Sequence, residues 1–123
     1  MSKPIRVLVV DDSALMRKLI PQILAADSSI EVVGTAMDGS FGLRKIEELN
    51  PQVVTLDLEM PGMNGWEFRR EQLSDPLLAR IPVVVASGSN PGAIDADALL
   101  PKPYGTAELS EVLARLSFGA AAA

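Results

Sequence analysis

The chain of 123 residues contains no cysteine and no histidine. The missing cysteine excludes disulfides, thiolate catalysis and zinc–thiolate sites. The missing histidine removes the usual general base, the usual nitrogen ligand of metals and any phosphohistidine on this chain. A metal ion would therefore have to be bound by oxygen ligands, which makes Mg²⁺, Ca²⁺ and Mn²⁺ the candidates.

Positive charge and long apolar runs are also scarce. The formal net charge is −5 and no basic stripe is present, so we expect no direct contact with nucleic acid. The apolar runs are too short to insert into a membrane. The first run is interrupted by Arg6 and followed by two aspartates, which is unlike a signal peptide. We therefore expect a cytoplasmic protein.

Length and composition predict one folded domain, because 48% of the residues are apolar and the chain has the size of a typical domain. We assign residues 1–118 to this domain and residues 119–123, which are alanine-rich, to a disordered tail. Short apolar runs predict five strands, over residues 5–10, 31–36, 53–57, 81–86 and 96–100.

Segments with helical periodicity alternate with these strands. The first begins at Asp12 or Ser13 as N-cap and continues through Pro21, where we expect a kink and no break. Three others cover about 40–49, 64–73 and 106–116. The predicted inward faces comprise Leu15, Leu19, Ile20, Ile23 and Leu24 in the first, Trp66, Phe68 and Leu73 in the third, and Leu109, Val112, Leu113 and Leu116 in the last. Alternating strands and helices predict an α/β fold with a doubly wound parallel sheet covered on both faces.

Polar side chains stand at the predicted carboxyl ends of four strands. They are Asp11 and Asp12 after the first strand, Asp57 after the third, Ser87 after the fourth and Lys102 after the fifth. In an open parallel sheet these ends meet at one crevice, where ligands bind. Taken singly, the aspartates could cap a helix, the serine could lie in a turn and the lysine could be a solvated charge. Their occurrence at four strand ends favours a common site.

Such a site would suit phosphoryl transfer. Three carboxylates in one crevice repel one another unless a cation binds, and Mg²⁺ is the natural choice because it takes few carboxylates and keeps several waters. Lys102 would add a mobile positive charge for a phosphate, and the Ser87 hydroxyl could donate to a phosphoryl oxygen. A carboxylate can itself be the nucleophile, which gives an acyl phosphate.

These residues resemble the receiver domain of bacterial response regulators, which sensor kinases of two-component systems phosphorylate. The resemblance covers essentially the whole chain. It rests on residues 9–13 (Val-Val-Asp-Asp-Ser), on Asp57 with residues 60–65 (Met-Pro-Gly-Met-Asn-Gly), on residues 87–88 (Ser-Gly) and on residues 102–103 (Lys-Pro). The first half is most similar to receivers of chemotaxis methylesterases, and the second half is similar to receivers of hybrid histidine kinases.

The resemblance implies a flavodoxin-like, five-stranded sheet in the order 2-1-3-4-5. It implies that Asp57 is the phosphoacceptor and that Asp11, Asp12, Asp57 and the backbone carbonyl of Glu59 bind Mg²⁺. Ser87 and Lys102 would then contact the phosphoryl oxygens, and the peptide bond before Pro103 would be cis. The implied function is a stand-alone phosphorelay switch, not an enzyme acting on a separate substrate. Its partners would be a sensor histidine kinase or phosphotransfer protein and an unidentified downstream target.

Two departures from the family pattern affect the expected output surface. Ser87 and Lys102 are only 15 residues apart, shorter than usual by roughly two helical turns. The fourth helix of the family, expected near residues 90–95, should therefore be shortened or lost. The position three before the lysine, which usually holds a switching aromatic residue, is Leu99. Coupling between Ser87 and an aromatic ring cannot operate here in the usual way.

Two other functions stay open from the residues alone. A Mg²⁺-dependent hydrolase could turn over through an aspartyl phosphate, with Glu59 as a second acid two residues after the nucleophile, although the chain is short for a substrate-enclosing insertion. A receiver-like interaction scaffold, natural or engineered and never phosphorylated, is the second alternative. Pro21, Leu99 and the shortened fourth helix motivate it.

Overall fold

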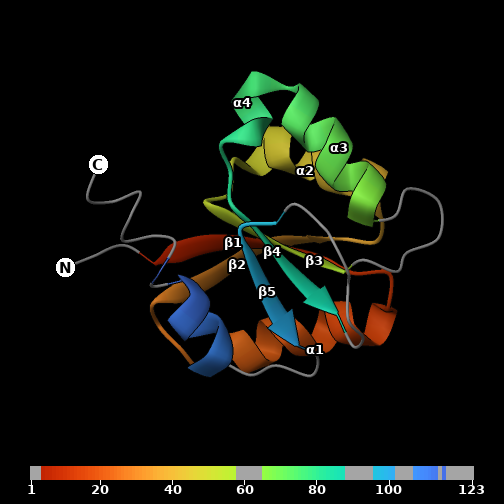
Figure 1. Ribbon diagram of the computed structural model, residues 1–123. Helices are drawn as coiled ribbons and strands as arrows, with labels where there is room; N and C mark the ends of the chain where they lie inside the picture. Colours follow the sequence, from red (N-terminus) through yellow and green to blue (C-terminus); the bar gives the residue numbers. More distant parts are fainter. Residues whose placement is uncertain (1–3, 58–64, 88–95, 102–106, 114, 116–123) are drawn as a thin grey trace.

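A computed structural model describes residues 4–57, 65–87, 96–101, 107–113 and 115 of the chain, with only the backbone described at Ser87 and Pro101. Five parallel strands form one sheet in the order β2-β1-β3-β4-β5 (Figure 1). The strands are β1 (Ile5–Val10), β2 (Ile30–Ala36), β3 (Val53–Asp57), β4 (Val83–Ser87) and β5 (Ala98–Pro101). The predicted flavodoxin-like fold and strand order are therefore confirmed.

Helices cover both faces of the sheet (Figure 1). On one face lie α1 (Ala14–Leu24) and the helical residues 107–113. The other face carries α2 (Gly39–Leu49), α3 (Gly65–Ser74) and the short α4 (Pro76–Ala79). Two apolar cores follow from this arrangement, because successive strand side chains point to opposite faces. In β1, for example, Val7 and Val9 belong to the first core, and Leu8 and Val10 belong to the second.

Local sequence signals fix the helix ends. The Ser13 hydroxyl accepts a hydrogen bond from the Met16 amide at 3.2 Å and caps α1. The Asp38 carboxylate accepts one from the Phe41 amide at 3.0 Å and caps α2. At the end of α2, Asn50 takes a left-handed conformation with φ of 49°, as is common for Gly and Asn at this position. The first helix is unbroken through Pro21, as predicted.

The inward faces of two helices were predicted too broadly. In α1 only Ile20 and Leu24 are buried, whereas Leu15, Leu19 and Ile23 are exposed. A helix resting on a sheet buries a narrow stripe, and five apolar residues within ten positions exceed its width. In α3 Phe68 is fully buried, but Trp66 and Leu73 are partly exposed while Arg69 and Gln72 are buried. Polar residues were not expected inside, because their burial depends on partners distant in the chain.

Strand and helix boundaries near β4 also differ from the prediction. The strand begins at Val83 and not at Ile81, because Ile81 ends the turn after α4, where its amide donates to the Leu78 carbonyl. The helix α4 itself was not predicted from the sequence. Asp75 caps it, with its carboxylate accepting from the Leu77 amide at 3.0 Å. The fifth strand begins at Ala98, two residues later than predicted.

Several expectations lie outside the described residues. These are the shortened fourth helix of the family near residues 90–95, the peptide bond before Pro103, Leu116 and the tail at 119–123. The α4 of Figure 1 precedes β4 and is a different element from that fourth helix. Within the described part of the chain, no helix is both long enough and apolar enough to cross a bilayer.

Candidate functional site

The register of the sheet brings the predicted site residues to one edge. Val10, the last residue of β1, pairs with Leu56 of β3, so that Asp11 and Asp57 both stand one position further along. Asp57 in turn pairs with Ala86, the residue before Ser87. Ser87 pairs with Pro101, the residue before Lys102. The carboxyl ends of these strands therefore form one row, as the sequence predicted.

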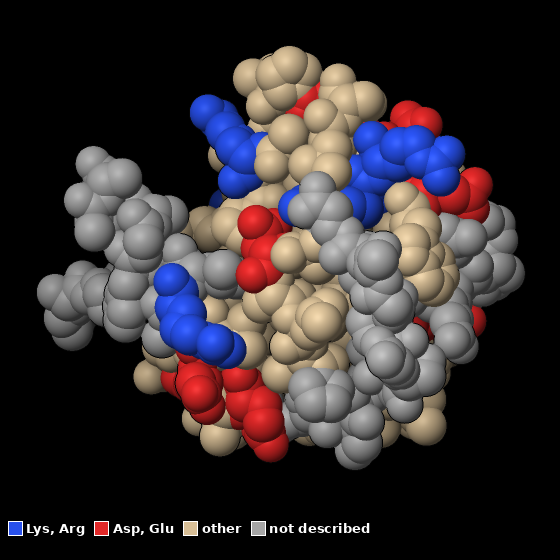
Figure 2. Space-filling model, viewed as in Figure 1, with Lys and Arg blue, Asp and Glu red and all other residues tan. Residues whose placement is uncertain are grey.

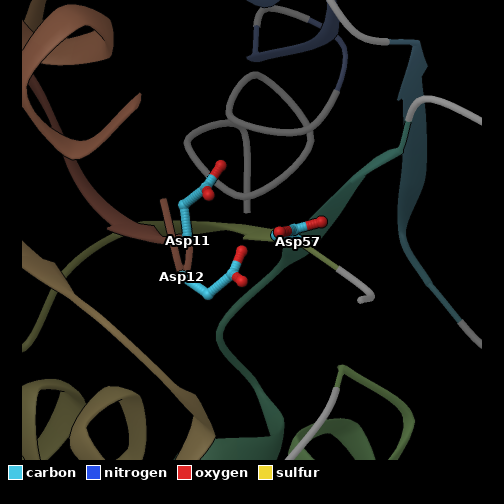
Figure 3. A group of neighbouring side chains, drawn as sticks. All are labelled: Asp11, Asp12 and Asp57. Carbon is cyan, nitrogen blue, oxygen red and sulfur yellow. The ribbon is translucent and has the colours of Figure 1, made fainter. Parts of the chain in front are cut away.

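Three carboxylates meet at this edge. Asp11, Asp12 and Asp57 each have a carboxylate oxygen within 4.8 Å of the others. Figure 3 shows them gathered where β1 and β3 end. Asp11 is buried, with 2% of its surface exposed, Asp57 is half-buried and Asp12 is exposed. A cation bound there would touch one buried carboxylate and remain open to solvent on the side of Asp12.

Hydrogen bonds hold the backbone around Asp11 in place. Its amide donates to the Ala36 carbonyl at 3.0 Å, which ties the turn to the end of β2. Its carboxylate accepts from the Ser13 amide at 2.9 Å. Its carbonyl accepts from Nη1 of Arg17 at 2.9 Å. These bonds fix the turn between β1 and α1, which presents the two aspartates in a set geometry.

The contact of Arg17 with the turn after β1 was not predicted from the sequence. Its guanidinium reaches back from α1 to the carbonyl of Asp11, six residues earlier. The feature of the sequence that could have indicated this contact is a basic residue six positions after Asp11. Because a guanidinium is always charged, it also offsets part of the repulsion among the carboxylates.

The donor set fits Mg²⁺. Carboxylate oxygens are the ligands that this ion prefers, and it retains several waters while taking only a few protein ligands. Three oxygens within 4.8 Å of one another can share one hard cation. The half-buried Asp57 contributes a carboxylate with two oxygens at the end of β3.

The structure describes the other predicted site residues only in part or not at all. The backbone of Ser87 ends β4 beside Pro101, but its side chain is not described. Glu59, Lys102 and Pro103 lie outside the described residues. Leu99 lies in β5 with 53% of its surface exposed.

Charge is mixed on the face shown in Figure 2. Basic side chains lie there in separate groups with acidic side chains between them. Among the described residues of this face, the basic side chains form no continuous surface.

Comparisons with known proteins agree with this geometry. The family described as response regulator receiver domain matches residues 7–114. A protein-glutamate methylesterase/protein-glutamine glutaminase of Koribacter versatilis is 64% identical over 68% of this chain, which is 22% of that protein. The corresponding protein of Symbiobacterium thermophilum is 44% identical over 92% of this chain and 33% of its own length. The chain thus spans a third or less of these relatives.

Solved structures of receiver domains are also similar to this chain. The response regulator domain of Thermotoga maritima CheB superimposes with a TM-score of 0.71 and 34% identity, covering 95% of this chain and 92% of that domain. The predicted similarity to receivers of the methylesterase class is confirmed by these relatives. The chain belongs to the response regulator receiver domain family of two-component signalling.

Proposed function

We propose that this receiver accepts a phosphoryl group on Asp57 from a phosphohistidine of a sensor kinase or phosphotransfer protein, and serves as a phosphorelay switch. The observation that supports this most is the meeting of three carboxylates from β1 and β3 within 4.8 Å. The donor must come from another protein, because this chain has no histidine.

The transfer step is a displacement at phosphorus. An oxygen of the Asp57 carboxylate forms a bond to phosphorus while the bond from phosphorus to the donor imidazole breaks. The electron pair of that bond leaves with the imidazole nitrogen, and the product is an acyl phosphate on Asp57. Hydrolysis by water later returns the carboxylate and releases inorganic phosphate.

Residues around Asp57 would stabilise the charge that develops on the phosphoryl oxygens. Asp11, Asp12, Asp57 and the backbone carbonyl of Glu59 would hold Mg²⁺, which when bound neutralises this charge. The hydroxyl of Ser87 would donate to one phosphoryl oxygen. The ammonium of Lys102 would pair with another.

Magnesium binding tests the metal part of this proposal. We expect calorimetry of the parent to show one Mg²⁺ site, and Asp12→Asn to weaken it by about tenfold or more, because one of three carboxylate ligands loses its charge. Glu47→Gln, an exposed acid on α2, removes the same charge away from the site and should leave the affinity unchanged. Equal affinity for Asp12→Asn and Glu47→Gln would contradict the proposed ligands.

A turnover assay separates the receiver from the alternative hydrolase, in which Glu59 would act as a second acid. Phosphoramidate carries the phosphorus–nitrogen bond of a phosphohistidine, and p-nitrophenyl phosphate is a generic phosphomonoester. A receiver should be phosphorylated by the first and release no more than about one equivalent of nitrophenol from the second. Sustained release with Glu59-dependent turnover would favour the hydrolase. No Mg²⁺ binding and no phosphorylation would favour the scaffold.

A further inference from the structure

An ion pair between a buried arginine of α3 and an exposed aspartate joins that helix to the residue before β5. Nη2 of Arg69 lies 3.1 Å from Oδ2 of Asp97, and Arg69 has only 6% of its surface exposed. The second nitrogen of the guanidinium, Nη1, donates to Oε1 of Gln72 at 2.8 Å. None of the reactions described above uses these residues.

The network is anchored on both sides. The Gln72 amide donates to the carbonyls of Leu78 at 2.8 Å and Ile81 at 2.9 Å, which fixes it to α4 and the turn before β4. Asp97 is held to β4 twice, because its amide donates to the Val83 carbonyl at 3.0 Å and its carboxylate accepts from the Val83 amide at 2.8 Å. Arg69 and Gln72 are buried, and a network anchored at this many points has little freedom to rearrange.

Within the part of the chain that the structure describes, the strand that this network holds has few other constraints. Among the described strands, β5 lies at the edge of the sheet and pairs with β4 alone (Figure 1). It has four residues, the last of which is Pro101, which has no amide hydrogen to donate. Leu99 is half-exposed, so packing holds the strand mainly through Leu100. Short edge strands with weak packing are prone to fraying and register slips.

We propose that Arg69 and Asp97 are positioning residues that fix the register of β5, and through it the place where Lys102 begins. This inference rests on the proposed role of Lys102 in binding the phosphoryl group. The ion pair stands at the amino end of β5, and Lys102 directly follows the carboxyl end. The pair belongs to α3 and to the residue before β5, whereas the three clustered carboxylates stand at the ends of β1 and β3, so the pair should affect the rate of phosphorylation and not the binding of Mg²⁺.

Two variants remove the pair and one controls for charge. Arg69→Met deletes the guanidinium, and Asp97→Asn neutralises the carboxylate while keeping its shape. Arg70→Met makes the same change at the adjacent, exposed arginine of α3. Circular dichroism confirms that each protein is folded under the assay conditions. The readouts are the Mg²⁺ dissociation constant, the rate of phosphorylation by acetyl phosphate at saturating Mg²⁺, and hydrogen exchange of the Leu99 and Leu100 amides.

We expect Arg69→Met and Asp97→Asn to slow phosphorylation by roughly ten- to a hundredfold, since displacement of a positioned group by about 1 Å has effects of this size. Their Mg²⁺ affinity should match the parent, and exchange in β5 should accelerate. The double variant should be no slower than the slower single variant, because both substitutions break the same link. Arg70→Met should behave as the parent does.

Three outcomes would overturn the inference. Rates and exchange equal to those of the parent would show that β5 is held without the pair. Parallel losses of rate and Mg²⁺ affinity would show a general loosening of the fold. A parent that takes no phosphoryl group would contradict the proposed function as well, whereas a phosphorylated parent with unaffected variants would contradict this inference alone.

Discussion

Thr55 shows at the scale of one residue how a buried polar atom influences stability. It lies in the middle of β3, between Val9 and Val84, with 2% of its surface exposed. Its hydroxyl has no hydrogen-bond partner within the part of the chain that the structure describes. A buried polar group without a partner carries a desolvation cost of about 1–3 kcal/mol.

Thr55→Val should therefore raise the free energy of unfolding by about 1 kcal/mol, because a methyl group replaces the unpartnered hydroxyl. Urea denaturation of the variant and the parent measures this. Thr35→Val, at a half-buried position of β2, is the matched control and should change stability little. A lower stability for Thr55→Val would show that the hydroxyl has a partner that the variant lost.

The spatial grouping of residues could be predicted from the sequence where it follows from strand ends. Asp11, Asp12 and Asp57 could be placed together because the chain changes from an apolar run to a carboxylate at each strand end. Arg17 and Arg69 could not be found in the same way. Their roles depend on contacts to Asp11 and Asp97, and only the packing of helices on the sheet determines which cation reaches which acceptor.

Among the elements, α2 and α3 approach each other closely at Gly42. A Cβ added there would lie 2.8 Å from Cε2 of Phe68 and 3.1 Å from Cγ2 of Val10. Phe68 is fully buried, so it cannot move aside without disturbing the core. The glycine is needed for this close approach, although glycine in a helix costs up to about 1 kcal/mol relative to alanine.

Gly42→Ala should lower the free energy of unfolding by about 1–3 kcal/mol, because the cost of overpacking exceeds the gain in helix propensity. Ser40→Ala, at an exposed position of the same helix, reports the effect of alanine without a clash and should be close to neutral. Chemical denaturation measures both. A Gly42→Ala protein as stable as the parent would show that α2 and α3 can separate at little cost.

Helices and strands could be predicted well from the periodicity of apolar residues. The burial of polar residues could not be predicted in this way. The five strands could be predicted because each is a short apolar run, and their order was implied by the resemblance to receiver domains. The inward faces of α1 and α3 were wrong in part, since apolar side chains outnumbered the available buried positions in α1. The four-residue α4 was missed because its signal, Asp75 followed by Pro76, is also a turn signal.

Across the whole molecule, one carboxylate links distant parts of the chain. Asp27, in the turn between α1 and β2, accepts a hydrogen bond at 2.6 Å from the hydroxyl of Ser110, which lies within the helical residues 107–113. It also accepts from the Ser29 hydroxyl at 2.6 Å and the Ser29 amide at 2.8 Å. The bond from Ser110, followed by those from Ser29, lowers the pKa of Asp27 from its ordinary value of 3.8.

A lowered pKa in the folded state means that this group stabilises the fold above the unfolded pKa of 3.8, and that the contribution is lost as the pH falls through the lower folded value. The parent should therefore lose more stability on acidification from about pH 6 to about pH 3 than Ser110→Ala does. Denaturation at several pH values measures the difference. Ser74→Ala, whose hydroxyl donates to a backbone carbonyl, should keep the pH dependence of the parent. Identical profiles for the parent and Ser110→Ala would contradict the assigned cause.

The central claim is that Asp57 is the phosphoacceptor of a receiver. Intact mass after incubation with Mg²⁺ and acetyl phosphate, for the parent and for Asp57→Ala, tests it most directly. The parent should gain the mass of one phosphoryl group, and the variant should gain none, because the acyl phosphate forms on that carboxylate. An adduct of equal yield on Asp57→Ala, or no adduct on a parent that binds Mg²⁺, would contradict the claim.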